Sequence, residues 1–163
     1  MQDRKKGGRP VEELEQYITE NQESFYRLAY TYVKDRDAAL DVVQNAVLKA
    51  LTHGDSLREP AYMKTWFYRI LVNEGLNYIR KNKRLIPVDE FWEQQAPEVD
   101  IPGKLDVYAA VERLSPNLRT VVVLRFFEDM PLQEIAAVTG LNLSTVKTRL
   151  YHALKVLKKD IGQ

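Results

Sequence analysis

The chain has 163 residues, of which 45% are hydrophobic and 29% charged, with a formal net charge of +1 and no cysteine. This composition suits a soluble chain with one or two small cores, and the lack of cysteine excludes a disulfide framework and a thiolate metal site. Residues 1–10 are polar and basic, and no apolar stretch approaches the roughly 20 residues that a membrane span requires. We therefore expect a cytoplasmic protein without a signal peptide or membrane insertion.

The first half of the chain shows apolar residues at spacings of three and four, which is typical of successive amphipathic helices. The second of these helices must end near Asp35, where the third begins. Residues 53–59 are rich in turn-forming side chains and are expected to form a loop, and Pro60 is well placed to begin a fourth helix that runs to about Asn82. Residues 11–83 are thus predicted to form an all-α module.

The expected fourth helix mixes aromatic rings, amides and cations. This combination suits single-stranded or opened DNA, because bases stack on aromatic rings for about 1 to 3 kcal/mol each while cations follow the backbone. Alternatively, most of its aromatic side chains belong to the core, and this interpretation is favoured for Trp66 and Phe67, which lie on a face that must be buried. Asn73, Asn77 and Arg80 are harder to place in a core.

Charge is unevenly distributed along the chain. Residues 69–84 carry five basic side chains and one acidic, whereas residues 85–106 carry six acidic side chains and one basic. The acidic segment also contains three prolines and a glycine, so residues 84–106 are predicted to be a flexible acidic linker. Fully extended, residues 85–106 reach about 75 Å, enough to cross roughly two turns of duplex. Phe91 and Trp92 within the linker are expected to dock either onto this protein or onto a partner.

Residues 107–161 have the pattern of a self-contained helical module that contains a helix-turn-helix. The first helix of this motif begins after Pro131, and Ala136 is small enough for two helices to cross closely. Gly140 can adopt the positive φ of the turn, and Ser144 can cap the second helix.

The second helix of the motif is expected to bury one apolar face and leave the other face free. From Ser144 to Lys159 the sequence has five basic residues and no acidic one, although a solvated helix normally mixes both signs. We therefore predict DNA binding, the alternative being a three-helix bundle that resembles a DNA-binding module by chance. The free face carries side chains of the types that reach base edges and phosphates from the major groove, namely Thr145, Lys147, Thr148, Tyr151, His152 and Lys155.

Three stretches of sequence resemble the extracytoplasmic-function (ECF) group of sigma-70 factors. They are DAALDVVQNAVLKA at residues 37–50, TWFYRILVN at residues 65–73 and STVKTRL at residues 144–150. They occur in the family's order, and the resemblance spans about residues 20–160. On these motifs the sequence is identified as a member of this group.

The resemblance implies an all-α fold with two small helical domains, a region 2-like bundle over residues 11–83 and a region 4-like helix-turn-helix domain over residues 107–161. It implies a sigma factor that directs core RNA polymerase to specific promoters and assists strand opening, with no enzymatic activity, no cofactor and no metal. The implied partners are promoter DNA and the β′ clamp helices and β flap of the polymerase. An anti-sigma factor, often membrane-anchored in this family, is the expected regulator.

The same resemblance assigns residues to three interfaces. The polymerase would be bound by Asp41, Gln44, Asn45 and Lys49. Asn45 stands where the family usually has an acidic residue, so the resemblance does not carry over one charged contact to a basic polymerase surface. The minus-ten element would be recognised and melted by the loop before the fourth helix and by that helix, through Asp55, Ser56, Trp66, Arg69, Asn73, Asn77 and Arg80. The minus-thirty-five element would be read by Ser144, Thr145, Lys147, Thr148, Arg149, Tyr151, His152 and Lys155.

A stand-alone helix-turn-helix regulator is the alternative function. Such a protein ordinarily dimerises on two half-sites and carries a sensor domain or ligand pocket, neither of which the N-terminal module plainly offers. An enzyme is disfavoured because the chain lacks a glycine-rich phosphate loop, and because His53 and His152 have no plausible nucleophile or metal-binding partners beside them.

Overall fold

The computed structural model describes residues 2–85 and 107–161, and within them every regular element is helical. The predicted all-α class is therefore confirmed. The N-terminal lobe contains α1 (Gln2–Glu20), α2 (Gln22–Val33), α3 (Arg36–Thr52), the 3-10 turns η1 (Gly54–Ser56) and η2 (Pro60–Tyr62), and α4 (Met63–Leu85). The C-terminal lobe contains α6 (Val107–Arg113), α7 (Pro116–Val122), the π-helical turn η3 (Val123–Phe127), α8 (Leu132–Thr139) and α9 (Leu143–Ile161).

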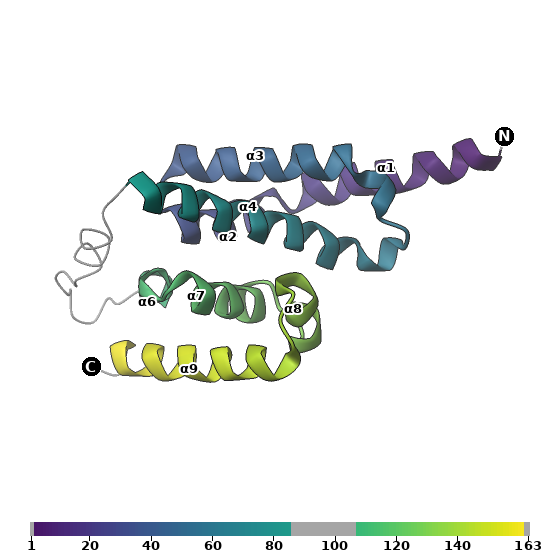
Figure 1. The fold of residues 1–163 in the computed structure, drawn as a ribbon. Helices are drawn as coiled ribbons and strands as arrows, with labels where there is room; N and C mark the ends of the chain where they lie inside the picture. Colours follow the sequence, from purple (N-terminus) through teal and green to yellow (C-terminus); the bar gives the residue numbers. More distant parts are fainter. Residues whose placement is uncertain (1, 86–106, 162–163) are drawn as a thin grey trace.

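The two lobes lie one above the other, and α4 of the upper lobe runs over α7 and α8 of the lower one (Figure 1). None of the described helices combines the length and the apolar character needed to cross a membrane. Most of the predicted linker, with Phe91 and Trp92, lies outside the described residues.

A local cap explains where α3 begins. The side chain of Asp35 accepts a hydrogen bond from the N–H of Ala38 at 2.9 Å, which caps α3 at the helix boundary that the sequence predicts. The prediction for the fourth helix was less accurate. Pro60 begins the short turn η2, and α4 itself begins at Met63 and continues to Leu85.

The helix-turn-helix has the predicted turn but a different cap. Gly140 adopts a φ of 75°, and its N–H bonds to the carbonyl of Ala136 at 2.9 Å, which ends α8. The predicted Ser144 cap is wrong, because α9 already begins at Leu143. Instead, the Asn142 side-chain oxygen accepts the N–H of Thr145 at 2.8 Å. Asparagine caps a helix as well as serine does, and it stands at the position where the chain leaves the turn.

The core of the N-terminal lobe is an aromatic cluster between α2 and α4. The ring of Phe25 lies 4.4 Å from that of Phe67 and 5.4 Å from that of Tyr68, measured between centroids. All three side chains are buried, while Trp66 is only half-buried at the edge of the core. The favoured core assignment is thus confirmed for Phe67 and holds only in part for Trp66.

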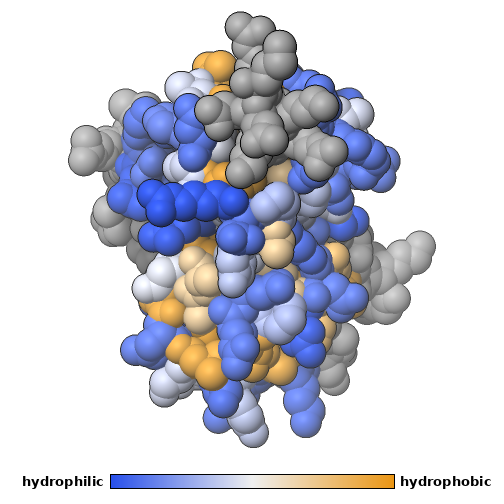
Figure 2. All heavy atoms as spheres, turned by 90° about the vertical axis from the view of Figure 1, so that its right-hand side faces the viewer, coloured by the Kyte–Doolittle hydropathy of each residue, from blue (hydrophilic) through white to orange (hydrophobic). Residues whose placement is uncertain are grey.

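Apolar side chains of both lobes join in one contiguous core. In the C-terminal lobe the buried Met130, Ile135 and Val138 belong to it, and in α4 so do Leu71 and Val72. Figure 2 shows no open cleft between the lobes at the end of the molecule formed by α8 and by the turns before α4. The sequence predicts two modules, but it gives no sign that they pack against each other.

Candidate nucleic-acid interface

One face of α9 presents the polar side chains expected to read DNA. Lys147, Thr148, Tyr151, His152 and Lys155 line a single open groove, and the Tyr151 ring is 77% exposed. On the opposite face, the apolar side chains at positions 146, 153 and 157 are buried in the core. The helix is therefore fixed by its apolar side, and the described residues that line the groove on its other side include two lysines and no acidic residue.

The other predicted residues of this helix behave differently. Ser144 is exposed at its N-terminal end, and the N–H of Thr145 is occupied by the cap. Arg149 is half-buried and, with Leu141, faces the other lobe across a cavity of about 210 Å³ that Asn73 of α4 also lines. Two residues assigned to different DNA elements thus meet at one cavity between the lobes.

The minus-ten candidates on α4 share one side of that helix, because they recur at spacings of three and four residues from position 66 to position 80. Arg69, Asn73 and Arg80 are exposed, and Trp66 and Asn77 are half-buried. The remaining two candidates lie in η1, and both are exposed, namely Asp55 and Ser56. The Ser56 hydroxyl donates to the His53 carbonyl at 2.8 Å, so it also stabilises the turn.

The outer face of α3 carries the polymerase candidates. Asp41, Gln44 and Asn45 are exposed. Lys49 forms an ion pair with Glu74 of α4, so its ammonium group also holds these two helices together.

The three leucines of α3 follow the apolar spacing of an amphipathic helix, yet all three are exposed. Leu40, Leu48 and Leu51 are exposed, Leu48 to 65%. Exposed large apolar side chains interspersed with polar ones are typical of a binding surface rather than of a solvated helix.

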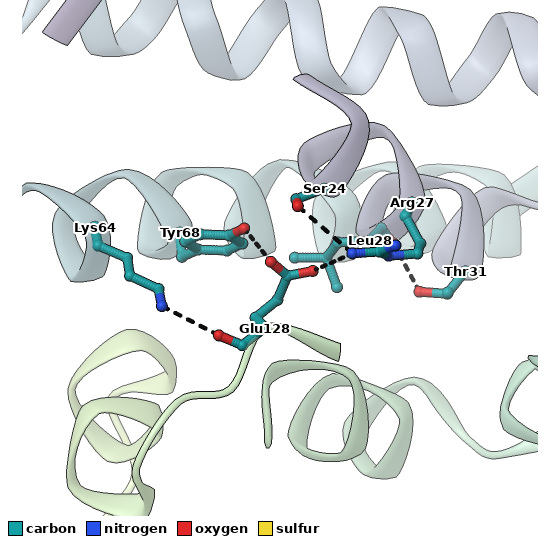
Figure 3. A network of polar contacts seen from close by, with 7 residues as sticks. All are labelled: Ser24, Arg27, Leu28, Thr31, Lys64, Tyr68 and Glu128. Atoms are coloured by element: carbon teal, nitrogen blue, oxygen red, sulfur yellow. Dashed lines mark hydrogen bonds and ion pairs between the residues drawn. The ribbon is translucent and has the colours of Figure 1, made fainter. Parts of the chain in front are cut away.

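A polar cluster joins the two lobes at Glu128, which follows η3 (Figure 3). Its side chain is only 5% exposed. Tyr68 of α4 donates to Glu128 Oε1 at 2.6 Å, and Arg27 of α2 pairs with Oε2 at 3.4 Å. Lys64 Nζ donates to the Glu128 backbone carbonyl at 3.1 Å. We call these four residues the interlobe cluster.

A second set of polar contacts crosses between the lobes at α7. The buried Arg119 guanidinium donates to the carbonyls of Thr31 in α2 and Leu114 in its own lobe. The hydroxyls of Tyr32 and Thr120 form a hydrogen bond across the same boundary. Burial raises the pKa of the Tyr32 hydroxyl and lowers the pKa of Arg119, because each charged form loses its hydration.

Sequence reasoning missed the contacts between the lobes. Glu128 lies 60 positions from Tyr68 and 101 positions from Arg27. No local pattern links residues so far apart, so only the folded chain reveals the pairing.

Comparison with known proteins places this arrangement in a family. The chain matches Sigma-70 region 2 over residues 17–85 and Sigma-70, region 4 over residues 104–157. It is 42% identical over 147 residues to RNA polymerase sigma factor SigV of Bacillus subtilis (strain 168), covering 86% of each chain. It is 28% identical over 151 residues to the ECF RNA polymerase sigma-E factor of Escherichia coli (strain K12), covering 82% of this chain and 78% of the relative.

Two solved structures share the fold. One is the sigma factor RpoE in complex with the anti-sigma factor NepR from Bartonella quintana, with a TM-score of 0.70 and 23% identity over 89% of this chain and 94% of that one. The other is CnrH in complex with the cytosolic domain of CnrY, with a TM-score of 0.65 and 23% identity over 91% of this chain and 87% of that one.

The two helical lobes and the turn at Gly140 define the class of helical proteins that contain a helix-turn-helix motif. The matches narrow this class further. The chain belongs to the ECF subgroup of the sigma-70 family and is an RNA polymerase sigma factor, as the sequence motifs indicate.

Proposed function

We propose that this sigma factor brings core RNA polymerase to promoters through three surfaces: the outer face of α3, the exposed side of α4 and the basic face of α9. The observation that carries this proposal is the α9 groove, in which two lysines, a histidine and two hydroxyl-bearing side chains are gathered on one exposed face. The chain itself performs no catalysis. The polymerase makes the RNA, and the sigma factor supplies promoter choice and strand opening.

The α9 face is suited to reading the minus-thirty-five element from the major groove. Nineteen residues of helix give a rod of about 28 Å, and Lys147 and Thr148 stand on its N-terminal half, which approaches the base edges in helix-turn-helix proteins. Each good side-chain contact provides about 1 to 3 kcal/mol of discrimination, too little for one helix to select a site alone. Mounting both lobes on one polymerase makes the second contact intramolecular and raises its effective concentration.

The exposed side of α4 is suited to the opened minus-ten strand. Arg69 and Arg80 are exposed and can follow the phosphates, while the half-buried Trp66 offers part of its ring for stacking. The turn with Asp55 and Ser56 precedes this helix and is the proposed site for a flipped base, whose extrusion costs a few kcal/mol that polar and aromatic contacts can offset.

The polymerase is proposed to bind α3 through its β′ clamp helices and the C-terminal lobe through its β flap. The exposed leucines of α3, at positions 40, 48 and 51, supply an apolar centre. Asp41, Gln44 and Asn45 supply a polar rim, and an apolar centre with a polar rim is the usual organisation of a protein interface.

We also propose that an anti-sigma factor, in this family often membrane-anchored, controls the protein in the cytoplasm. Of the two structural relatives, the sigma factor RpoE is in complex with the anti-sigma factor NepR, and CnrH is in complex with the cytosolic domain of CnrY.

In vitro transcription with core polymerase and genomic fragments tests the proposal. Lys147→Ala should reduce run-off product at preferred promoters about tenfold, whereas Lys158→Ala, also on the exposed part of α9, should have little effect. Asp41→Ala should weaken capture of core polymerase without changing DNA selection. A wild-type protein that binds DNA tightly as a symmetric dimer and never directs initiation would instead be a stand-alone regulator.

A further inference from the structure

The cavity that Asn73 and Arg149 share is lined by side chains from four helices. Its volume is about 210 Å³, and α4, α7, α8 and α9 all contribute to its wall. None of the four residues of the interlobe cluster lines it. Because a water molecule occupies roughly 30 Å³ in the liquid, about seven of them would fill this volume. The cavity is therefore large enough for a small organic molecule.

Three polar side chains line this cavity with hydrogen-bond donors that remain free. The hydroxyls of Thr120 and Thr139 are already used, because each donates to a backbone carbonyl of its own helix at 2.8 Å. Within residues 2–85 and 107–161, no hydrogen bond or ion pair engages the side chains of Asn73, Asn117 or Arg149. Two amides and one guanidinium are thus available to a ligand.

The charged groups of the cavity wall have a single sign. Arg149 is half-buried and always protonated, and no acidic residue is among the described residues that line the cavity. A partly desolvated cation without a counterion favours an anion beside it. The planar guanidinium also presents paired N–H groups that match two oxygens of a carboxylate or a phosphate. The wall is therefore complementary to an oxyanion.

An apolar part of the wall lies beside these donors. Val72 and Leu76 of α4 line it together with Leu141 of the turn that follows α8. Val72 is buried, and the two leucines are half-buried. An oxyanion held at Arg149 leaves room for a short carbon chain against these side chains, and burial of that chain adds affinity that an inorganic ion cannot gain.

We propose that this cavity binds a small organic oxyanion, a phosphate or carboxylate group on a short carbon chain, and that the bound anion competes with promoter DNA. Arg149 pairs with the oxyanion, and the amides of Asn73 and Asn117 donate to it. Competition follows because Arg149 and Asn73 are also proposed DNA contacts, and a guanidinium that holds the ligand is not free for a DNA phosphate. The competition rests on the proposed function, whereas binding of the anion does not.

Asn117→Asp is the most informative variant, because Asn117 is not assigned to any contact with DNA or polymerase. The change keeps the shape of the side chain, removes the amide donor and adds a carboxylate that repels an anion in the cavity. Asn117 is exposed at the second position of α7, where an acidic side chain suits the helix. Gln133→Glu is the matched control, since it adds the same charge at the exposed second position of α8, outside the cavity.

An NMR titration of the isotope-labelled full chain measures binding. n-Propyl phosphate should shift the side-chain amide signals of Asn73 and Asn117 with a dissociation constant on the order of 1 mM, and butyrate should shift the same signals. Asn117→Asp should weaken binding of n-propyl phosphate at least about tenfold, because it replaces a donor by a like charge, and Gln133→Glu should change it less than about twofold. Inorganic phosphate should bind wild type more weakly than n-propyl phosphate.

Two outcomes of the titration would overturn the site. One is an affinity for n-propyl phosphate that Asn117→Asp leaves unchanged. The other is a set of shifts confined to the groove around Lys147 on α9, which would show general attraction of anions to the exposed lysines.

Run-off transcription with core polymerase tests the competition. At constant ionic strength and limiting sigma factor, n-propyl phosphate at about ten times its dissociation constant should lower the product of wild type and Gln133→Glu by up to about tenfold. The product of Asn117→Asp should be unaffected. Equal inhibition of all three proteins, or none despite binding, would refute competition. If wild type gives no specific product with any genomic fragment, the proposed function fails, and the titration still decides whether the cavity binds the anion.

Discussion

Gly75 of α4 lies directly against the ring of Tyr32 of α2. A Cβ atom built at Gly75 would overlap the Cδ2 and Cε2 atoms of that ring. The same tyrosine reaches across the lobe boundary with its hydroxyl to Thr120. The absence of a side chain at one position of α4 therefore sets where Tyr32 lies, and with it one of the contacts between the lobes.

Gly75→Ala should destabilise the protein although alanine is the better helix former. Alanine gains about 1 kcal/mol of helix propensity, whereas overpacking a buried ring costs about 1 to 3 kcal/mol. We expect a net loss of up to about 2 kcal/mol in the free energy of unfolding, measured by urea denaturation. In a Tyr32→Leu background the loss caused by Gly75→Ala should be much smaller, because the smaller side chain removes the clash. An equal loss in both backgrounds would show that the ring is not its cause.

The buried tyrosines should make the protein sensitive to alkali. Burial raises the pKa of Tyr68 above its ordinary value of 10.0. The hydrogen bond to Glu128 and the negative charge of Glu128 raise this pKa further. Burial likewise raises the pKa values of Tyr17 and Tyr32. A raised pKa in the folded state means that, as the pH rises, these tyrosines lose their protons in the unfolded chain before they do so in the folded chain. Stability is therefore complete below about pH 10 and falls as the pH rises above it, by up to about 1.4 kcal/mol per pH unit for each tyrosine.

Urea denaturation between pH 9 and 11.5 measures this dependence. Tyr68→Phe should be less stable at neutral pH by about 1 to 3 kcal/mol, because Glu128 loses a buried hydrogen-bond donor, and its stability should fall less steeply above pH 10. Tyr151→Phe, at a ring that is 77% exposed, is the control for loss of a hydroxyl. A slope unchanged by Tyr68→Phe would show that this tyrosine ionises equally in both states.

The cap of α9 distinguishes two positions near the start of this helix, Asn142 and Ser144. Asn142→Ala removes the oxygen that accepts the Thr145 N–H and should cost about 1 kcal/mol, which lowers the melting temperature by roughly 3 °C. Ser144→Ala, one position inside the helix, should change stability by less than about half of that amount. Thermal unfolding followed by circular dichroism measures both, and equal losses would contradict the observed cap.

The features predictable from the sequence are those set by neighbouring residues. Asp35 caps α3 and Gly140 ends α8 because each needs only a few adjacent backbone groups. The Ser144 prediction failed because two side chains near the turn could supply the cap, and sequence spacing does not decide between them. The pairing of Glu128 with Arg27 depends on how the lobes pack, which no local pattern encodes.

Exposed leucines on α3 show a further limit of sequence periodicity. A partner-binding face and a core face have the same helical spacing, so Leu48 cannot be separated from the buried residues of its helix by pattern alone. Its 65% exposure identifies it as part of a surface. The polar candidates beside it, such as Asp41 and Gln44, are exposed in any amphipathic helix, so their exposure is less informative than that of the leucine.

Leu48→Ser should therefore weaken polymerase binding and leave folding intact. Burial of a leucine side chain in an interface contributes about 1.5 to 3 kcal/mol, so the dissociation constant for core polymerase should rise at least tenfold. Val11→Ser on α1 replaces another exposed apolar residue, outside the surfaces proposed to bind the polymerase, and is the matched control. Titration of labelled protein with core polymerase gives both affinities, and circular dichroism gives the helix content. Equal affinities for Leu48→Ser and the control would show that the outer face of α3 is not part of the polymerase interface. If Leu48 were buried there, replacing it with serine would weaken binding, because the hydroxyl would have to be desolvated.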